Sequence, residues 1–120
     1  MPKDIDIDIV RKGPCSVMHV RGEVNWNSSP EFRDALLDLF ENRGQELVVV
    51  DLAEVKRMES SGVSVLIEGL RAANKKEAHL ILARLSGAVR HVLELTRLAR
   101  VFEIVETEAQ ALSTCRRRAA

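Results

Sequence analysis

The segment Leu47–Val63 constrains the fold most, because it has the pattern of a strand, a short polar turn and the start of a helix with no residues left over. Residues 47–50 are apolar and mostly β-branched, which is typical of a buried strand. Apolar residues then recur at helical spacing at Val63, Leu66, Ile67, Leu70 and Ala73. The Ser-Ser-Gly sequence at 60–62 is therefore predicted to open a helix that directly follows a buried strand.

Two interpretations of Ser60 and Ser61 are open at this point. A helix N-terminus presents unpaired N–H groups and a partial positive charge. A serine there can cap the helix, which contributes about 1 kcal/mol. It can instead carry a phosphate next to N–H groups that tolerate the negative charge. Spacing alone favours capping, although capping by itself does not explain a pair of serines.

The rest of the chain predicts strands that alternate with helices. Residues 5–9 alternate Ile with Asp, and residues 17–21 follow a Lys-Gly-Pro turn, so the two segments are expected to form an antiparallel hairpin that Gly22 ends or bulges. Further strands are expected at 79–83 and 101–105. Helices are expected after Ser28-Ser29-Pro30, after Ser86-Gly87 and from Thr107 through Leu112.

This order predicts an α/β fold in a single domain over residues 1–120. The sheet is expected to be mixed and four- to five-stranded, with an N-terminal antiparallel hairpin, right-handed parallel crossovers and about four helices. With 120 residues, 46% of them hydrophobic, the chain is long enough for one compact core.

Composition argues against several classes of function. The 18 basic and 18 acidic residues cancel, and the only aromatic side chains are Trp26, Phe32, Phe40 and Phe102, so nucleic-acid binding is not expected. The N-terminus lacks the pattern of a signal peptide, and no apolar run approaches the ~20 residues that cross a bilayer. We therefore expect no membrane insertion and a cytoplasmic location.

The two cysteines, Cys15 and Cys115, are too few and too far apart in sequence to suggest a disulfide framework. Cys15 is interpreted as a small residue that enters a strand. Cys115 lies next to three arginines in residues 113–120, which are expected to form a flexible basic tail.

Sequence motifs for catalysis are also missing. Met58-Glu59-Ser60-Ser61-Gly62 lacks the leading Gly of a hydrolase nucleophile elbow, the glycines form no phosphate loop, and no Cys/His/Asp cluster has metal-ligand spacing. His19, His79 and His91 stand alone in sequence and are interpreted as ordinary core or surface residues. The protein is expected not to be an enzyme and to hold neither a metal nor a cofactor.

One family carries the same pattern over nearly the whole chain. The segment from Asp51-Leu52 to Met58-Glu59-Ser60-Ser61-Gly62-Val63 follows Gly22-Glu23-Val24 and precedes Val89-x-x-Val92-Leu93 and Phe102-Glu103-Ile104. This arrangement resembles the STAS family, and within it the single-domain anti-sigma factor antagonists. Two positions differ from the usual pattern: Glu59 replaces an Asp before the serine pair, and Asn25 replaces the Asp that ends a Gly-Glu-Leu-Asp loop.

The resemblance implies a regulatory binding module. Such a protein binds an anti-sigma factor that is also a serine kinase, which uses ATP and Mg²⁺ to phosphorylate the first serine of the pair, and a separate phosphatase reverses the modification. Here the phosphorylated residue would be Ser60. The expected partner-binding residues are Asn25, Trp26, Asn27, Glu59, Ser61, Gly62, Ser64 and Glu68.

Other functions fit the same resemblance. The protein could instead be an accessory STAS subunit that docks an ABC-transporter ATPase in lipid trafficking without being phosphorylated, or a STAS sensor for a small ligand or nucleotide. Trp26 is also open to two interpretations, because a lone Trp in a loop can either cover the edge of the first helix or stand out as an interface anchor.

Overall fold

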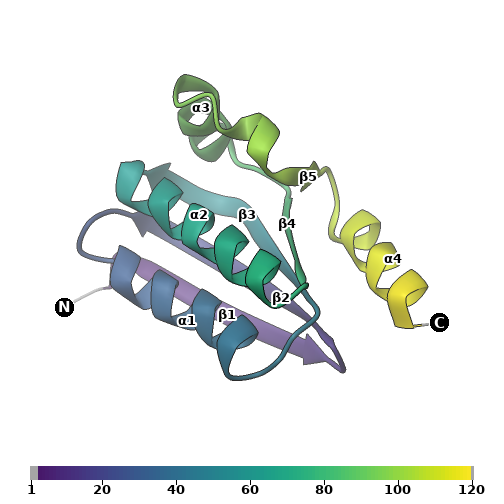
Figure 1. Ribbon diagram of the computed structural model, residues 1–120. Coiled ribbons are helices and arrows are strands. Elements are labelled where there is room, and N and C mark those ends of the chain that lie inside the picture. The colour runs from purple at the N-terminus through teal and green to yellow at the C-terminus, as the bar shows by residue number, and fades with distance from the viewer. Residues whose placement is uncertain (1–2, 120) are drawn as a thin grey trace.

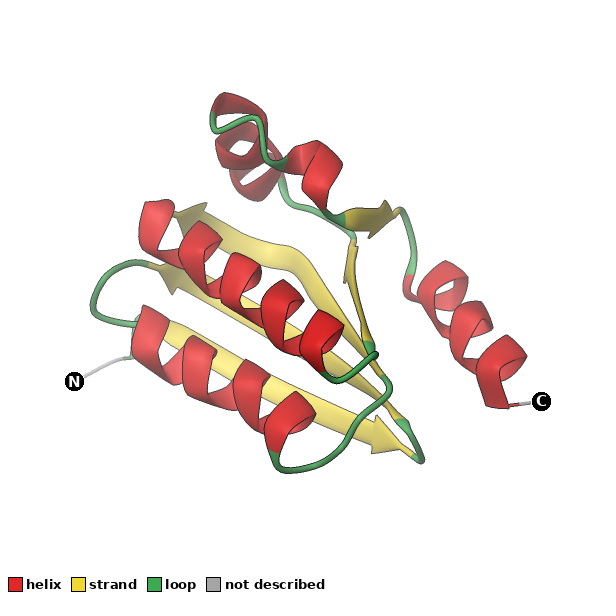
Figure 2. Ribbon diagram, in the orientation of Figure 1, coloured by secondary structure: helices red, strands yellow, loops and turns green. Residues whose placement is uncertain are grey.

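The computed structural model describes residues 3–119 and contains a five-stranded mixed sheet (Figures 1 and 2). The strands lie in the order of the chain: β1 (Ile5–Lys12), β2 (Cys15–Val24), β3 (Leu47–Met58), β4 (His79–Ala83) and β5 (Glu103–Val105). β1 and β2 pair antiparallel, and all other neighbours pair parallel. The predicted fold class is therefore confirmed.

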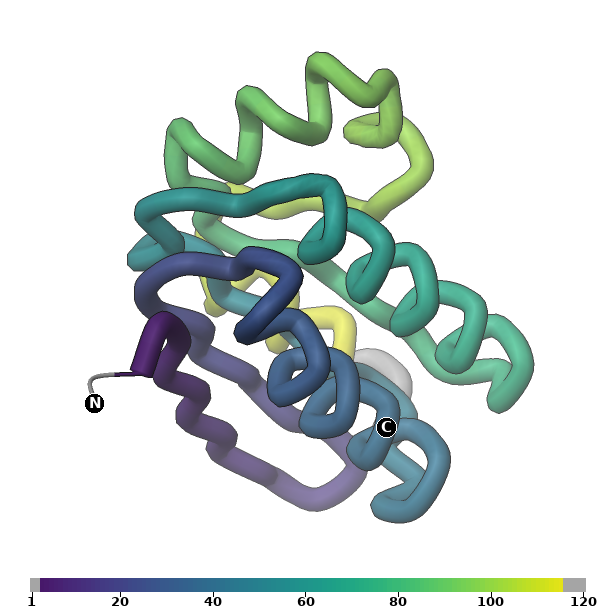
Figure 3. Tube along the Cα trace, turned by 90° about the vertical axis from the view of Figure 1, so that its left-hand side faces the viewer, coloured from purple at the N-terminus to yellow at the C-terminus, as the bar shows by residue number. Residues whose placement is uncertain are grey.

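The helices cover both faces of the sheet. α1 (Ser29–Glu41) and α2 (Ser60–Lys75) lie side by side on one face, where α3 (Gly87–Leu95) also packs, and α4 (Glu108–Ala119) lies on the other (Figures 1 and 3). α1 and α2 approach closely at Gly69, since a Cβ there would come within 2.5 Å of Leu36 Cδ2. The larger core lies between these helices and the sheet, and its fully buried side chains include Met18, Phe32, Leu36, Phe40, Leu52 and Leu66.

A smaller apolar cluster lies between α4 and the opposite face of the sheet. Alternate residues of the strands point to this side, and the cluster comprises Cys15, Val17, Leu47, Val49, Ile81, Ala83 and Ala111. The helix was expected to end at Leu112, but Leu112 and Cys115 also pack against the cluster at helical spacing, so α4 continues. Residues 113–119 of the expected flexible tail are thus helical, and residue 120 lies outside the described residues.

Cys15 enters a strand as interpreted, but the expectation that the cysteines form no disulfide is wrong. Cys15, at the start of β2, and Cys115, on α4, form a disulfide across 100 sequence positions, with 6.4 Å between the two Cα atoms. The sheet and α4 bring the two residues together, which sequence spacing cannot show.

Several strand boundaries also differ from prediction. The strand expected at 47–50 does not end in a short polar turn, because β3 keeps pairing with β2 as far as Met58. β2 runs on to Val24 and bulges beside Gly22, whose φ of +99° is readily adopted by glycine. At the other end of the chain, Ala99–Val101 forms a short 3₁₀ turn (η1), in which the Val101 N–H donates to the Leu98 carbonyl oxygen at 3.1 Å, so β5 begins only at Glu103.

The Thr107–Gln110 capping box predicted before α4 is confirmed, because the Gln110 N–H donates to Thr107 Oγ1 and Gln110 Oε1 accepts from the Thr107 N–H.

Candidate functional site

Ser60 lies on the surface where β3 gives way to α2. β3 ends at Met58, Glu59 takes the N-cap position with extended backbone, and Ser60 is the first helical residue. The Glu59 N–H donates to the carbonyl oxygen of Val24 at 2.9 Å, so the ends of β2 and β3 are tied together. The side chains of Glu59 and Ser60 are both exposed. The prediction that this segment opens a helix is confirmed.

Neither serine caps α2 with its side chain. The helix has no side-chain cap hydrogen bond, and the N–H of Gly62 donates instead to the Glu59 carbonyl oxygen at 2.9 Å. Ser61 Oγ is buried without a hydrogen-bond partner among the described residues, whereas Ser60 is exposed. The capping interpretation is therefore wrong, and of the two serines only Ser60 exposes its side chain to solvent.

Gly62 explains why the serines stand where they do. It is buried, and a Cβ at this position would come within 2.7 Å of Val24 Cγ1 and 2.8 Å of Met58 Cγ. The missing side chain lets the first turn of α2 lie directly on the ends of β2 and β3. Gly62 thus sets the position of Ser60 by packing.

The loop at residues 25–27 lies beside this helix start and is held by its own side chains. Asn25 Oδ1 accepts hydrogen bonds from the N–H groups of Asn27 (2.9 Å) and Ser28 (3.0 Å), which is a typical Asx turn. The side-chain amides of Asn25 and Asn27 donate to Asp4 Oδ2 at 3.3 and 3.4 Å. An Asp at position 25 could not donate this bond and would place a second carboxylate beside Asp4, so Asn25 suits this chain.

Trp26 stands out from the loop instead of covering α1. Its exposed fraction is 77%, the largest among the exposed large hydrophobic residues of the described chain. Val24 of β2 pairs with Met58 of β3. Trp26 lies two positions after Val24, and Ser60 lies two positions after Met58. The structure therefore brings Trp26 and Ser60 to the same end of the sheet.

The two remaining predicted contact residues lie further along α2. Ser64 is exposed, and its Oγ donates to the Ser60 carbonyl oxygen at 3.1 Å. Glu68 lies one turn beyond and forms an ion pair with Arg33 of α1. The predicted set thus gathers around the start of α2, except that Glu68 is engaged by α1. Sequence reasoning missed Arg33 and Asp4, whose partners are distant in sequence.

A second polar cluster lies on the other face of the sheet, beneath the start of α4. His19 Nε2 and Glu108 Oε2 are 2.7 Å apart, and Asp51 Oδ2 lies 4.0 Å from the same nitrogen. These three residues have the chemistry of a divalent-metal site, and their ligand atoms lie within 4.8 Å of one another. Arg84 Nη1 is 3.3 Å from Asp51 Oδ2, however, so a guanidinium already supplies positive charge here.

The two carboxyl groups of this cluster have opposite pKa shifts. Burial, and then the hydrogen bond with Glu108, raises the pKa of Asp51. The hydrogen bond with Asp51 is the main cause that lowers the pKa of Glu108. Asp51 is therefore harder to ionise than an exposed Asp, and Glu108 is easier to ionise than an exposed Glu.

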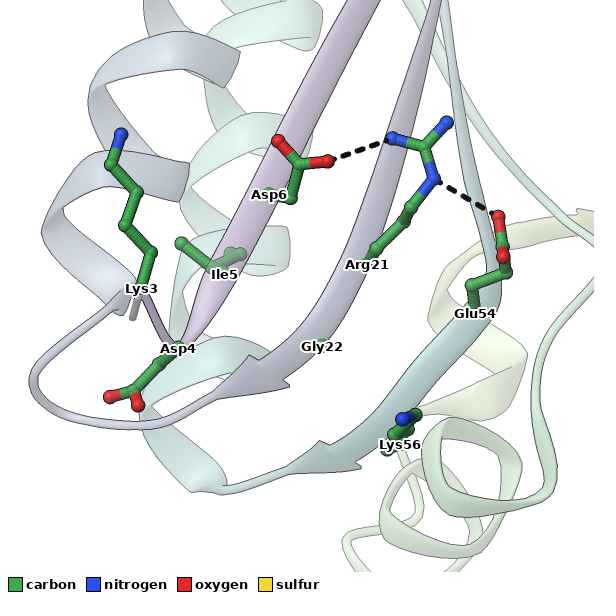
Figure 4. Close-up of a pocket in the computed structure, with 8 residues that line it drawn as sticks. All are labelled: Lys3, Asp4, Ile5, Asp6, Arg21, Gly22, Glu54 and Lys56. Carbon is green, nitrogen blue, oxygen red and sulfur yellow. Dashed lines mark hydrogen bonds and ion pairs between the residues drawn. The ribbon is translucent and has the colours of Figure 1, made fainter. Parts of the chain in front are cut away.

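An open hollow of about 470 Å³ lies over β1, β2 and β3, away from Ser60 (Figure 4). Arg21 projects between Asp6 and Glu54 and contacts their carboxylates at 3.2 and 3.1 Å. Because these charges satisfy one another and the hollow is open, it has no feature of a built ligand site.

Comparison with known proteins decides the family. The STAS domain family model matches residues 6–111. The chain belongs to the STAS domain family. This STAS protein is 26% identical over 108 residues to the anti-sigma-B factor antagonist of Listeria monocytogenes, a match that covers 89% of this chain and 94% of that protein.

Solved structures share the fold. An anti-sigma factor antagonist from Mycobacterium paratuberculosis superposes with a TM-score of 0.82 at 23% identity and covers 97% of each chain. The Bacillus cell fate determinant SpoIIAA in its phosphorylated form superposes with a TM-score of 0.72 at 17% identity and covers 92% of this chain and 99% of its own. Within residues 3–119, no helix is long and apolar enough to cross a membrane.

Proposed function

We propose that this STAS protein is an anti-sigma factor antagonist that binds its partner through the start of α2 and is released by phosphorylation of Ser60. The observation that carries the proposal is the exposed Ser60 hydroxyl at the first position of α2, beside the exposed Trp26 loop. The relative from Listeria is named for the same activity.

The chemistry of this joint suits a phosphate switch. A phosphate adds about −1.5 to −2 charge and three acceptor oxygens, which the N-terminus of α2 tolerates. In a complex the same group would stand beside Glu59, where it repels negative charge and must be desolvated. Binding therefore falls without a change of fold, consistent with the fold shared by the phosphorylated Bacillus protein.

The proposed partner is an anti-sigma factor with serine-kinase activity, which binds ATP and Mg²⁺ itself, and a serine phosphatase restores the unmodified form. The STAS protein acts in this pathway as a binding module, not as an enzyme, and works in the cytoplasm where ATP is available. Trp26 is proposed as the apolar anchor, since an exposed Trp in a fixed loop contributes a large contact area at little entropic cost.

The test mixes purified protein with candidate kinase partners and ATP and locates phosphate by peptide mass spectrometry. Phosphate is expected on Ser60. Ser60→Asp is expected to weaken partner binding by at least ~100-fold, which corresponds to about 3 kcal/mol. Ser113→Asp, on an exposed residue of α4 on the other face of the sheet, is the matched control and should leave affinity unchanged.

Full binding by Ser60→Asp, together with no phosphate on Ser60 from any candidate kinase, would contradict the switch. Binding of a transporter ATPase under those conditions would instead support the accessory-subunit function, which uses a docking surface without modification.

A further inference from the structure

The outer edge of β1 is unpaired in the described chain. β1 is the first strand in the sheet order and pairs only with β2. The register is unbroken from Ile5 opposite Gly22 to Lys12 opposite Cys15. An edge strand of this length presents a row of backbone donors and acceptors to a second chain.

The direction of these backbone groups follows from one hydrogen bond. The N–H of Glu23 donates to the Asp4 carbonyl oxygen at 2.8 Å, so that pair is hydrogen-bonded. Hydrogen-bonded pairs alternate along an antiparallel ladder, which places Asp8 and Val10 among the residues bonded to β2. The backbone groups of the odd-numbered residues, Ile9 among them, therefore point outward.

The backbone of this edge is free to pair, although the strand carries charged side chains, which on an edge usually discourage pairing. Within residues 5–12 the strand has neither proline nor a bulge. Ile9 and Val10 are 36% and 42% exposed, so adjacent apolar side chains of both faces reach solvent here.

The charges of β1 are arranged so that the strand complements a second copy of itself. Acidic residues occupy the first half and basic residues the second half. In the antiparallel register that sets Ile9 opposite Ile9, Asp6 lies opposite Lys12, once on each side of the two-fold axis. Asp6 also contacts Arg21 of its own chain, so Lys12 would be a second cation beside it. The same register sets Ile7 opposite Arg11, and the outward backbone groups of all these odd-numbered residues meet across the axis.

Neighbouring registers are disfavoured by like charges. Setting Asp8 opposite itself, or Ile7 opposite Ile7 so that Asp6 faces Asp8, places carboxylates directly across from each other. The Ile9-centred register is the longest one that keeps opposite charges paired.

We propose that β1 is a self-association surface, through which two copies of this chain pair their β1 strands antiparallel about Ile9 and form one continuous sheet. The surface is distinct from Ser60, which belongs to the turn between β3 and α2, so the inference does not depend on the proposed switch.

Sedimentation equilibrium over a range of concentrations, with the full chain, tests the proposal. The wild type is expected to be a reversible dimer. Ile9→Pro removes an outward N–H at the axis and should raise the dissociation constant at least ~10-fold, because hydrogen bonds across the axis are lost without breaking the β1–β2 ladder. Thermal melts establish that each variant is folded.

Charge variants test the register. Lys12→Asp alone and Asp6→Lys alone each create two like-charge pairs, so both should be monomeric at concentrations where the wild type is dimeric. An equimolar mixture of the two should form a heterodimer, since every Asp then faces a Lys. Lys56→Asp, the same change at an exposed residue of β3, is the matched control and should leave the dimer intact.

Hydrogen exchange gives a second readout. The amides of Ile7, Ile9 and Arg11 should become protected as concentration rises, while those of Asp8 and Val10 are protected throughout. A wild type that stays monomeric at every concentration, or a dimer that survives both Ile9→Pro and Lys12→Asp, would overturn the proposal.

Discussion

The Asp51 carboxyl shows how a single residue acquires unusual chemistry from its surroundings. It is 3% exposed, its Oδ1 accepts the Ala53 N–H at 3.0 Å, and its Oδ2 lies 3.3 Å from Arg84 Nη1. Arg84 compensates only part of the cost of burial, because the pKa of Asp51 is still raised. The ionised side chain therefore costs stability at neutral pH.

Asp51→Asn is expected to gain stability relative to the wild type as the pH rises from about 4 to about 7. Because the pKa of Asp51 is raised in the folded state, protonated Asp51 stabilises the fold. This contribution is complete below pH 3.8, the ordinary pKa of Asp, and is lost as the pH rises through the raised pKa. Asn keeps the acceptor for Ala53 and has no charge to bury. Denaturant unfolding of both proteins across this pH range measures the effect.

Asp38→Asn is the matched control with the opposite sign. Hydrogen bonds from Asn42 and Arg43 lower the pKa of Asp38. The ionised carboxylate of Asp38 therefore stabilises the fold above pH 3.8, the ordinary pKa of Asp, and this stabilisation is lost as the pH falls. This variant should lose stability relative to the wild type as pH rises. An Asp51→Asn protein that behaved the same way would refute the assignment of Asp51.

Among the elements, α4 depends most on long-range contacts. It covers the second apolar cluster, supplies Glu108 to the polar cluster and is joined to β2 by the Cys15–Cys115 disulfide. Among the described side chains of the helix, Ala111, Leu112 and Cys115 pack against this cluster. Tertiary contacts, more than helix propensity, hold it in place.

Replacing both cysteines by serine is expected to lower the free energy of unfolding by about 2–4 kcal/mol, because a cross-link over 100 positions restricts the unfolded chain. Denaturant titrations with and without a dithiol reductant measure this. The wild type should lose stability in the reductant, while the double serine variant should not respond.

Hydrogen exchange of α4 locates the effect. Its amides should exchange faster after reduction, whereas those of α2 should change little. Equal exchange of α4 in the oxidised and reduced proteins would show that the disulfide does not hold the helix.

At the scale of the whole molecule, the sheet separates the proposed switch from the second polar cluster. Ser60 and Trp26 lie at the ends of β3 and β2, while α4 and its polar cluster lie on the opposite face of the sheet from α1 and α2 (Figures 1 and 3). A charge added at Ser60 is therefore expected to act locally.

Phosphorylation of Ser60 should shift backbone amide resonances only in residues 23–27 and 58–64, with residues 79–115 unchanged. Surface changes of this kind alter stability by less than about 0.5 kcal/mol, so the unfolding midpoint should also stay nearly constant. Two-dimensional amide spectra of the modified and unmodified proteins check this. Shifts that extend into α4 would instead indicate a conformational change transmitted through the sheet.

Local pattern alone determined most of the fold and the position of Ser60. The Ile–Asp alternation of β1, the β-branched run of β3 and the apolar spacing of α2 are signals within a few residues, and each element was confirmed. The helix start at Ser60 was predicted from the local sequence pattern in the same way.

Only the tertiary structure decided which side chains meet. The sheet register brings His19 to Asp51, α4 brings Cys115 to Cys15, and the return of β1 along β2 brings Asp4 to the Trp26 loop. Sequence could not show these contacts, because they join residues up to 100 positions apart. The exposure of Ser60 and the burial of Ser61 were likewise decided by the packing of Gly62 on Val24 and Met58.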